Sequence, residues 1–144
     1  MSAETVRDAM VPEPTTLGAD ASAQEAGRCF ADNGEVRAIF VTEDGGRLLG
    51  VVTRKTLVRE VVAAGLEPRR VALREIAEPP NFTLDAGLEL EGAFRVLEEE
   101  DLERVPVVEE GGRLVGVLSR AVVQRRLAED EPPEGEPEAG SVVL

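Results

Sequence analysis

The chain has 144 residues, 42% of them apolar, which is enough to bury the core of one compact domain or of two small ones. It contains no His and one cysteine, so it lacks the commonest general base and the commonest zinc ligand, and it cannot form an internal disulfide. The formal net charge of −13 argues against general nucleic-acid binding, in which Lys and Arg neutralise phosphates.

The first half of the chain predicts a short helical turn at about 4–10, an extended piece at 15–17, and then a helix. Residues 22–25 (Ser-Ala-Gln-Glu) have capping-box spacing, and the helix that follows buries Ala26, Cys29 and Phe30 and ends at Gly34. Cys29 is therefore interpreted as a small buried hydrophobe and not as a nucleophile. Strands at 36–42 and 48–53 flank an Asp-Gly-Gly turn, and a helix at about 54–64 ends at Gly65.

The second half predicts the same elements in the same order. A helical turn at 71–77 and an extended piece at 82–84 precede a helix whose apolar residues run from Leu88 to Leu97, with Asp85 as its candidate N-cap. Strands at 104–108 and 114–118 flank a Glu-Gly-Gly turn, and the last helix spans about 119–128.

The two halves are an internal repeat. Residues 41–54 and 107–120 are identical at nine of fourteen positions with an offset of 66, and the match continues upstream with a shift of one residue. Each unit is βαββα and too small to bury both of its faces alone, so we expect an α+β fold in which the two copies pack sheet against sheet. The expected boundaries are 1–68 and 69–128, followed by an acidic, Pro-rich tail at 129–144 that is expected to be disordered or extended.

No stretch approaches the 18 apolar residues that a membrane helix needs, and residues 1–4 lack the features of a signal peptide. Together with the single cysteine, this predicts a cytoplasmic protein without membrane association.

Two pairs of segments carry a resemblance to a known family. They are 37–41 (Arg-Ala-Ile-Phe-Val) with 50–53 (Gly-Val-Val-Thr), and 104–108 (Arg-Val-Pro-Val-Val) with 116–119 (Gly-Val-Leu-Ser). In this order, and with the opening Val-Arg-Asp-Ala-Met of residues 6–10, the chain resembles the CBS domain pair, or Bateman module, over about 5–128. The resemblance implies a non-catalytic regulatory module whose repeats are related by a pseudo-twofold axis. It also implies two clefts between the repeats, which often hold adenosine-containing ligands such as AMP, ADP, ATP or S-adenosylmethionine.

Ligand binding is expected where each second helix begins, because a helix N-terminus offers free N–H groups to an anion. With the neighbouring strand ends, this gives the candidate ligand-binding residues Thr16, Arg37, Thr53, Arg54 and Thr56 in the first copy and Thr83, Arg104, Ser119 and Arg120 in the second. Two alternatives stay open: Thr53 and Ser119 are equally good helix caps, and the arginines fit ordinary solvated helix faces.

The sequence departs from the family where nucleotide-binding members have [Ser/Thr]-x-x-Asp, with the carboxylate accepting both ribose hydroxyls. Thr56 and Val122 stand at these Asp positions. A lost hydrogen bond to a charged group costs roughly 1.5–3 kcal/mol, or about 10- to 100-fold in affinity.

Two functions therefore remain. One is a sensor that binds a nucleotide or another anion and signals to a partner protein in trans; the other is a degenerate module for dimerisation or protein docking. In both we expect no enzymatic activity, no resident cofactor and no metal. We also expect a homodimer that covers the apolar helix face of Leu57, Val58, Val61 and Val62.

Overall fold

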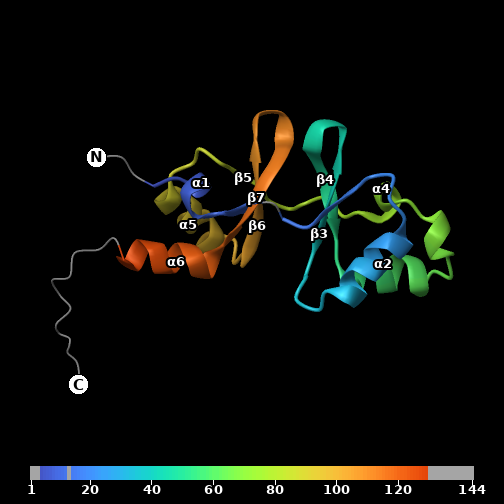
Figure 1. Cartoon of the computed structure of the whole chain (residues 1–144). Helices are drawn as coiled ribbons and strands as arrows, with labels where there is room; N and C mark the ends of the chain where they lie inside the picture. Colours follow the sequence, from blue (N-terminus) through green and yellow to red (C-terminus); the bar gives the residue numbers. More distant parts are fainter. Residues whose placement is uncertain (1–3, 13, 130–144) are drawn as a thin grey trace, which may run out of the picture.

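The computed structural model describes residues 4–12 and 14–129, and it shows two similar units next to each other, here called copy one and copy two (Figure 1). Copy one contains β2 (Thr16–Gly18), α2 (Ala23–Asp32), β3 (Ile39–Glu43), β4 (Arg47–Val52) and α3 (Arg54–Leu57), which continues as a π-helical turn over Val58–Val62. Copy two contains β5 (Leu84–Asp85), α5 (Leu90–Glu99), β6 (Arg104–Glu109), β7 (Arg113–Ser119) and α6 (Arg120–Glu129). The leading segments hold α1 (Val6–Ala9) with β1 (Val11–Pro12), and α4 (Leu73–Ile76).

The strands form one mixed sheet in the order β2-β3-β4-β7-β6-β5, with β1 added to β7. In each copy the first strand is parallel to the second, and the second and third form an antiparallel hairpin. Within the sheet, the two copies are joined by one pair of residues, Arg47 of β4 with Arg113 of β7. This confirms the predicted α+β fold of two βαββα units.

The predicted hairpin turns of both copies and the predicted N-terminal cap of α2 are confirmed. Each hairpin turns on two glycines at positive φ. The φ angles are 76° at Gly45 and 94° at Gly46 in copy one, and 77° at Gly111 and 80° at Gly112 in copy two. Ser22 caps α2, since its hydroxyl accepts a hydrogen bond from the Glu25 N–H while the Glu25 carboxylate accepts one from the Ser22 N–H.

Some local predictions are wrong. Asp85 does not cap α5; its carboxylate accepts a hydrogen bond from the Gly87 N–H in the preceding turn, and the N-cap position belongs to Glu89. Helix α2 ends one residue before Asn33, whose side-chain amide donates to the Cys29 carbonyl, so the C-terminal cap is Asn33 and not Gly34. Strand β3 starts at Ile39, three residues later than predicted, and only the first turn of the 54–64 helix is α-helical.

Each copy completes its core with the leading helix of the other. Val6 and Ala9 of α1 are buried among residues of α5, β6 and β7, and Leu73 and Ile76 of α4 are buried among residues of α2, β3 and β4. Figure 1 shows α1 beside α5 and α6, and α4 at the end of the molecule that holds α2. The two apolar cores are otherwise separate, so the physical units do not coincide with the repeats in the sequence.

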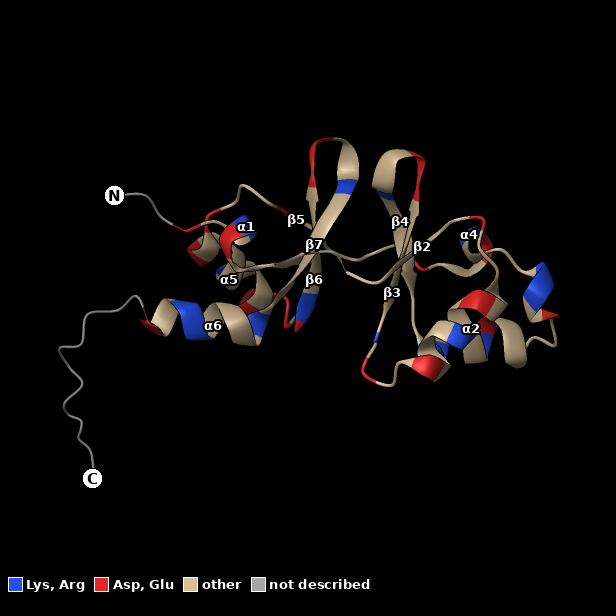
Figure 2. Cartoon of the chain, viewed as in Figure 1, with Lys and Arg blue, Asp and Glu red and all other residues tan. Residues whose placement is uncertain are grey.

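Charged residues lie in the two hairpins, near their tips (Figure 2). Glu109 is held between Arg7 and Arg113, and at the equivalent place Glu43 is held between Arg74 and Arg47. The hydrogen bond from Arg7, together with the charges of both arginines, holds the pKa of Glu109 below its ordinary value.

No described helix is both long enough and apolar enough to cross a membrane. The predicted acidic tail lies, from residue 130 onward, outside the described residues.

Candidate ligand-binding cavity between the two copies

A cavity of about 440 Å³ lies between the copies. Its wall is largely apolar and comes from equivalent places in both copies, with Phe40 and Val51 on one side and Pro106 and Val117 on the other. The chain segments before β2 and β5 close it with Thr15 and with residues 80–82. Because most of these positions are related by the internal repeat, the cavity follows the pseudo-twofold relation of the two copies.

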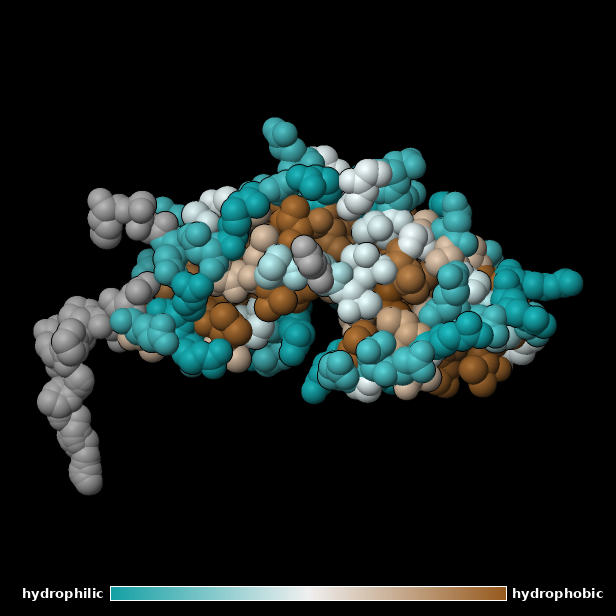
Figure 3. All heavy atoms as spheres, viewed as in Figure 1, coloured by the Kyte–Doolittle hydropathy of each residue, from teal (hydrophilic) through white to brown (hydrophobic). Residues whose placement is uncertain are grey.

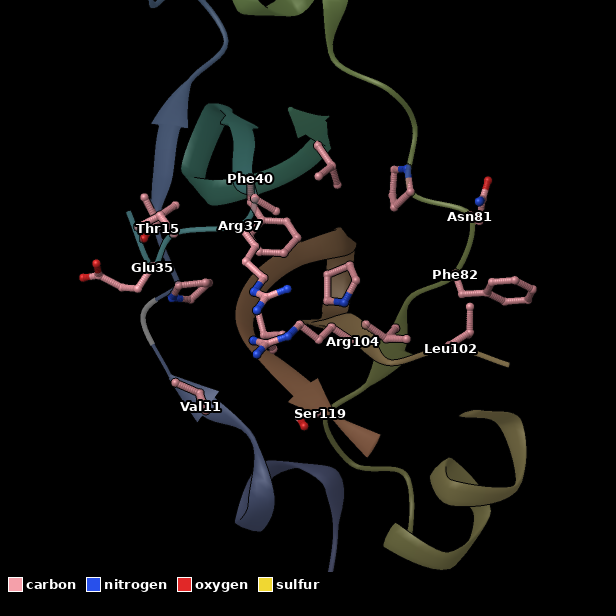
Figure 4. A pocket seen from close by; sticks show the side chains of 18 residues that line it. Val11, Thr15, Glu35, Arg37, Phe40, Asn81, Phe82, Leu102, Arg104 and Ser119 are labelled. Carbon is pink, nitrogen blue, oxygen red and sulfur yellow. The ribbon is translucent and has the colours of Figure 1, made fainter. Parts of the chain in front are cut away.

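Two of the predicted residues, Arg37 and Arg104, point into this cavity (Figure 4). Arg37 lies just before β3, and Arg104 is the first residue of β6. Among the described residues, neither guanidinium forms a hydrogen bond or an ion pair, and both side chains remain exposed. Two unpaired cations at one apolar cavity suit a ligand with an anionic group and an apolar body.

Ser119 also lines the cavity, whereas Thr53, its equivalent in copy one, does not. Ser119 accepts only a long hydrogen bond, 3.5 Å from the Val122 N–H, so its hydroxyl is free to turn toward a ligand. Thr53 is a helix cap whose hydroxyl accepts from the Thr56 N–H at 3.2 Å. The two cap positions therefore differ in what they offer to the cavity.

Thr56 lies in the interior and not at the cavity. It is 1% exposed, and its hydroxyl donates to a carboxylate oxygen of Glu78 at 3.0 Å and accepts from the Thr53 N–H at 3.1 Å. Glu78 also pairs with Arg59. In this arrangement Thr56 has no free acceptor for a ribose hydroxyl, and Val122 of copy two has no polar side-chain atom at all.

Arg54 and Arg120 are also placed away from the cavity wall. Arg54 donates to the carbonyl oxygens of Val36 at 2.7 Å and Phe30 at 3.1 Å, and its guanidinium lies 4.8 Å from the centre of the Phe30 ring. Arg120 donates to the Leu97 carbonyl at 3.3 Å and pairs with Glu103 at 2.6 Å. Each arginine thus joins the start of the second helix of its copy to the end of the first.

We expect Arg54→Ala to lower the stability of the fold by about 1–2 kcal/mol and to leave ligand affinity unchanged, because it removes carbonyl contacts and a cation–π contact at an exposed site. Urea unfolding measures the first effect and calorimetric titration the second. Lys55→Ala is the matched control, since Lys55 is the next residue, is exposed, and forms no ion pair or side-chain hydrogen bond within the described part of the chain. Lost ligand binding at unchanged stability would contradict the structural role.

Thr16 and Thr83 do not line the cavity, but the residues just before them, Thr15 and Phe82, do. Two polar lining residues, Glu35 and Asn81, are absent from the sequence-based set. Both lie outside helices and strands, where no periodic pattern indicates which way a side chain points.

The fold, with two βαββα repeats and a cavity between them, defines a two-repeat class of domain, and comparison with known proteins agrees. The family model described as "CBS domain" matches residues 6–63 and 73–129. The chain belongs to the CBS domain family and contains two of these domains as a pair.

The sequence is 31% identical to hypoxic response protein 1 of Mycobacterium tuberculosis over 125 residues, which cover 87% of this chain and 86% of that protein. The crystal structure of hypoxic response protein I with two coordinated zinc ions has a TM-score of 0.72 at 30% identity and covers 85% of this chain and 98% of that one. The crystal structure of CBSX2 in complex with AMP has a TM-score of 0.67 at 25% identity and covers 87% and 96%.

Enzymes that match this chain do so over a small part of their length. Inosine-5'-monophosphate dehydrogenase of Mycobacterium leprae is 26% identical over 110 residues, which cover 76% of this chain and 20% of the enzyme. The matched part is thus a minor portion of that enzyme.

The structure of hypoxic response protein I contains two coordinated zinc ions. The chain contains no His and one cysteine, and within residues 4–12 and 14–129 no three side chains of His, Cys, Asp or Glu are grouped as metal ligands.

Proposed function

We propose that this CBS pair is a non-catalytic regulatory module that binds an anionic ligand of the adenosine-nucleotide type in the cavity between its copies. The observation that carries the proposal is a pair of guanidinium groups at one largely apolar cavity, Arg37 from copy one and Arg104 from copy two, neither of which has a partner among the described residues. The described lining contains one carboxylate, Glu35, so the two arginines leave an excess of positive charge there, in a protein whose net charge is −13. This local excess marks a place suited to an anion.

Different residues of the cavity wall are proposed to bind different parts of the ligand. Phe40, Val51, Pro106 and Val117 offer the apolar surface that a purine ring needs, and the two arginines offer bidentate donors to a phosphate. Ser119 supplies a hydroxyl at the same wall. The crystal structure of CBSX2, which has the same fold, is that of a complex with AMP, and this supports the choice of ligand class.

Because a bound ligand would contact both copies, binding would change the free energy that holds the two copies in their present arrangement. We propose that this is how the module signals to an effector protein in trans, and that it does so as a homodimer.

The test is isothermal titration of nucleotide-stripped protein with AMP, ADP, ATP and S-adenosylmethionine. We expect Arg37→Ala and Arg104→Ala each to weaken binding of the preferred nucleotide about 10- to 100-fold, since each removes a hydrogen bond to a charged group. Arg69→Ala is the matched control, because Arg69 is an exposed arginine that does not line the cavity. Equal affinity of all three variants and the wild type would place the ligand elsewhere.

A second function, docking or dimerisation without a ligand, is favoured by the buried Thr56 and by the intramolecular partners of Arg54 and Arg120. Flat titrations with all four compounds would select it over the sensor.

A further inference from the structure

The chain has two asparagines, which differ in the residue that follows them. Asn33, the C-terminal cap of α2, precedes Gly34, whereas Asn81 precedes Phe82. Both asparagines are exposed. Figure 3 shows mainly hydrophilic residues where Figure 1 places the loop after α2, at the edge of the gap between the two halves. Water therefore reaches the side-chain amide of Asn33.

The backbone nitrogen of Gly34 is open to reaction with that amide. A β-carbon added at Gly34 would meet no atom within 4 Å, so no neighbouring group crowds this part of the backbone. Among the described residues, the Gly34 N–H donates no hydrogen bond. The Asn33 side chain is held by one hydrogen bond, from Nδ2 to the Cys29 carbonyl at 3.1 Å, and such a bond contributes about 1 kcal/mol. The two groups can therefore meet at a low cost in free energy.

We propose that Asn33 is a site of spontaneous deamidation that alters the wall of the cavity. The Gly34 backbone nitrogen, on losing its proton, bonds to the side-chain carbonyl carbon of Asn33, and the bond from that carbon to Nδ2 breaks. Nδ2 takes up a proton and leaves as ammonia, and a cyclic succinimide remains. Water then opens the ring at one of its two carbonyls and gives either aspartate or isoaspartate, in which the backbone runs through the side chain. The sum is amide plus water to carboxylate plus ammonium, with no oxidant or reductant.

Both products disturb the end of α2. The new carboxylate lies at the C-terminal end of the helix, where the macrodipole disfavours negative charge. It also cannot donate a hydrogen bond to the Cys29 carbonyl, as the amide of Asn33 does. Isoaspartate, in addition, adds one carbon atom to the backbone between α2 and β3.

Arg54 transmits this change to the cavity. Its guanidinium donates to the Phe30 carbonyl at 3.1 Å and to the Val36 carbonyl at 2.7 Å, and so holds both ends of the loop that contains Asn33. Val36 and Arg37 line the cavity. Because a longer backbone between two held points must move one of them, isoaspartate at position 33 displaces the segment that places Arg37. This step rests on the ligand site proposed above, in which Arg37 is one of two cations.

Peptide mapping by mass spectrometry, after long incubation of the folded chain in mildly alkaline buffer, tests the modification. We expect Asn33 to gain the mass difference between an amide and a carboxylic acid, largely as isoaspartate. Asn81 should stay intact, because the side chain of Phe82 crowds the nitrogen that would attack. Gly34→Ala is the matched variant, since its methyl group has room in the fold and should slow the reaction roughly 10-fold. Asn33 that stays intact in the folded chain, or that reacts no faster than Asn81, would overturn the proposal.

Calorimetric titration tests the effect on the cavity. We expect incubated wild-type protein to bind the preferred nucleotide about 10-fold more weakly than fresh protein, since a contact from Arg37 to a charged group is lost. Incubated Gly34→Ala should bind as tightly as fresh protein. Equal affinity of fresh and incubated wild-type protein would refute the effect on the cavity. If fresh protein binds no nucleotide, the ligand proposal fails, and the mass measurement still decides whether Asn33 deamidates.

Discussion

A fragment of residues 1–68 is expected to stay unfolded in solution, although it contains the whole first repeat of the sequence. The core of copy one includes Val71, Leu73 and Ile76, which the fragment lacks. Each fully buried aliphatic side chain contributes roughly 1.5–3 kcal/mol, so their loss together approaches the whole stability of a small domain.

The fragment would also lose the backbone hydrogen bonds that join residues 19–23 to residues 71–74, at the start of α4. The Leu73 and Arg74 N–H groups donate to the carbonyls of Ala21 and Ala19, at 2.8 and 3.0 Å. The N–H of Ala23 donates to the carbonyl of Val71 at 2.8 Å. These groups lie at the start of α2, where they would have to be satisfied by water instead.

A fragment of residues 14–80, nearly equal in length, is the matched control. It retains the complete core of copy one, so circular dichroism should show a cooperative thermal transition for 14–80 and none for 1–68. In the full chain, Leu73→Ala should cost about 2–5 kcal/mol, because Leu73 is 0% exposed. A cooperative transition of 1–68 as high as that of 14–80 would contradict the exchange of leading helices.

This exchange of helices could not be predicted from the sequence. Val6 and Leu73 hold equivalent positions in two nearly identical apolar patterns, and each pattern fits either core. The hairpins, by contrast, depend on local chemistry. A Gly-Gly pair between two apolar runs specifies a turn at positive φ whatever surrounds it, and both turns form as predicted.

The candidate site was predictable in part for the same reason. Arg37 and Arg104 fall within strands that the repeat predicts, at 36–42 and 104–108, and in the structure both line the cavity. Arg54 and Arg120 looked equally suitable as positive charges at helix starts, but each has carbonyl partners more than 15 positions away in the chain. A sequence pattern shows the charge of such a side chain, whereas its partner depends on the packing of two helices.

Gly50→Ala is expected to lower the melting temperature by roughly 10 °C, because overpacking beside a backbone segment costs about 1–3 kcal/mol. A β-carbon at Gly50 would lie 2.7 Å from the Glu78 carbonyl oxygen and 3.0 Å from the Ala77 side chain. That segment is fixed to β4, since the N–H groups of Val51 and Glu78 each donate to the carbonyl of the other, at 2.8 and 2.9 Å. The backbone must therefore move away from the strand.

Gly116 of β7 is the residue equivalent to Gly50, and we expect Gly116→Ala to destabilise the fold less than Gly50→Ala does. A β-carbon there would meet the Met10 sulfur at 2.6 Å and the Val11 carbonyl oxygen at 2.8 Å. The sulfur is at the end of a flexible side chain and can shift, so part of the overlap at Gly116 is relieved more cheaply than at Gly50. Gly34→Ala is the control for both, because its β-carbon would meet no atom within 4 Å.

Gly50→Ala should also affect the ligand site, so this substitution tests ligand binding as well as stability. The segment that crosses Gly50 continues into residues 80–82, which line the cavity. If this segment is held by β4 as the hydrogen bonds indicate, Gly50→Ala should weaken nucleotide binding under conditions where the protein is still folded, and Gly34→Ala should not. A chain that tolerates Gly50→Ala with unchanged melting temperature would show that the segment does not lie against β4 at this distance.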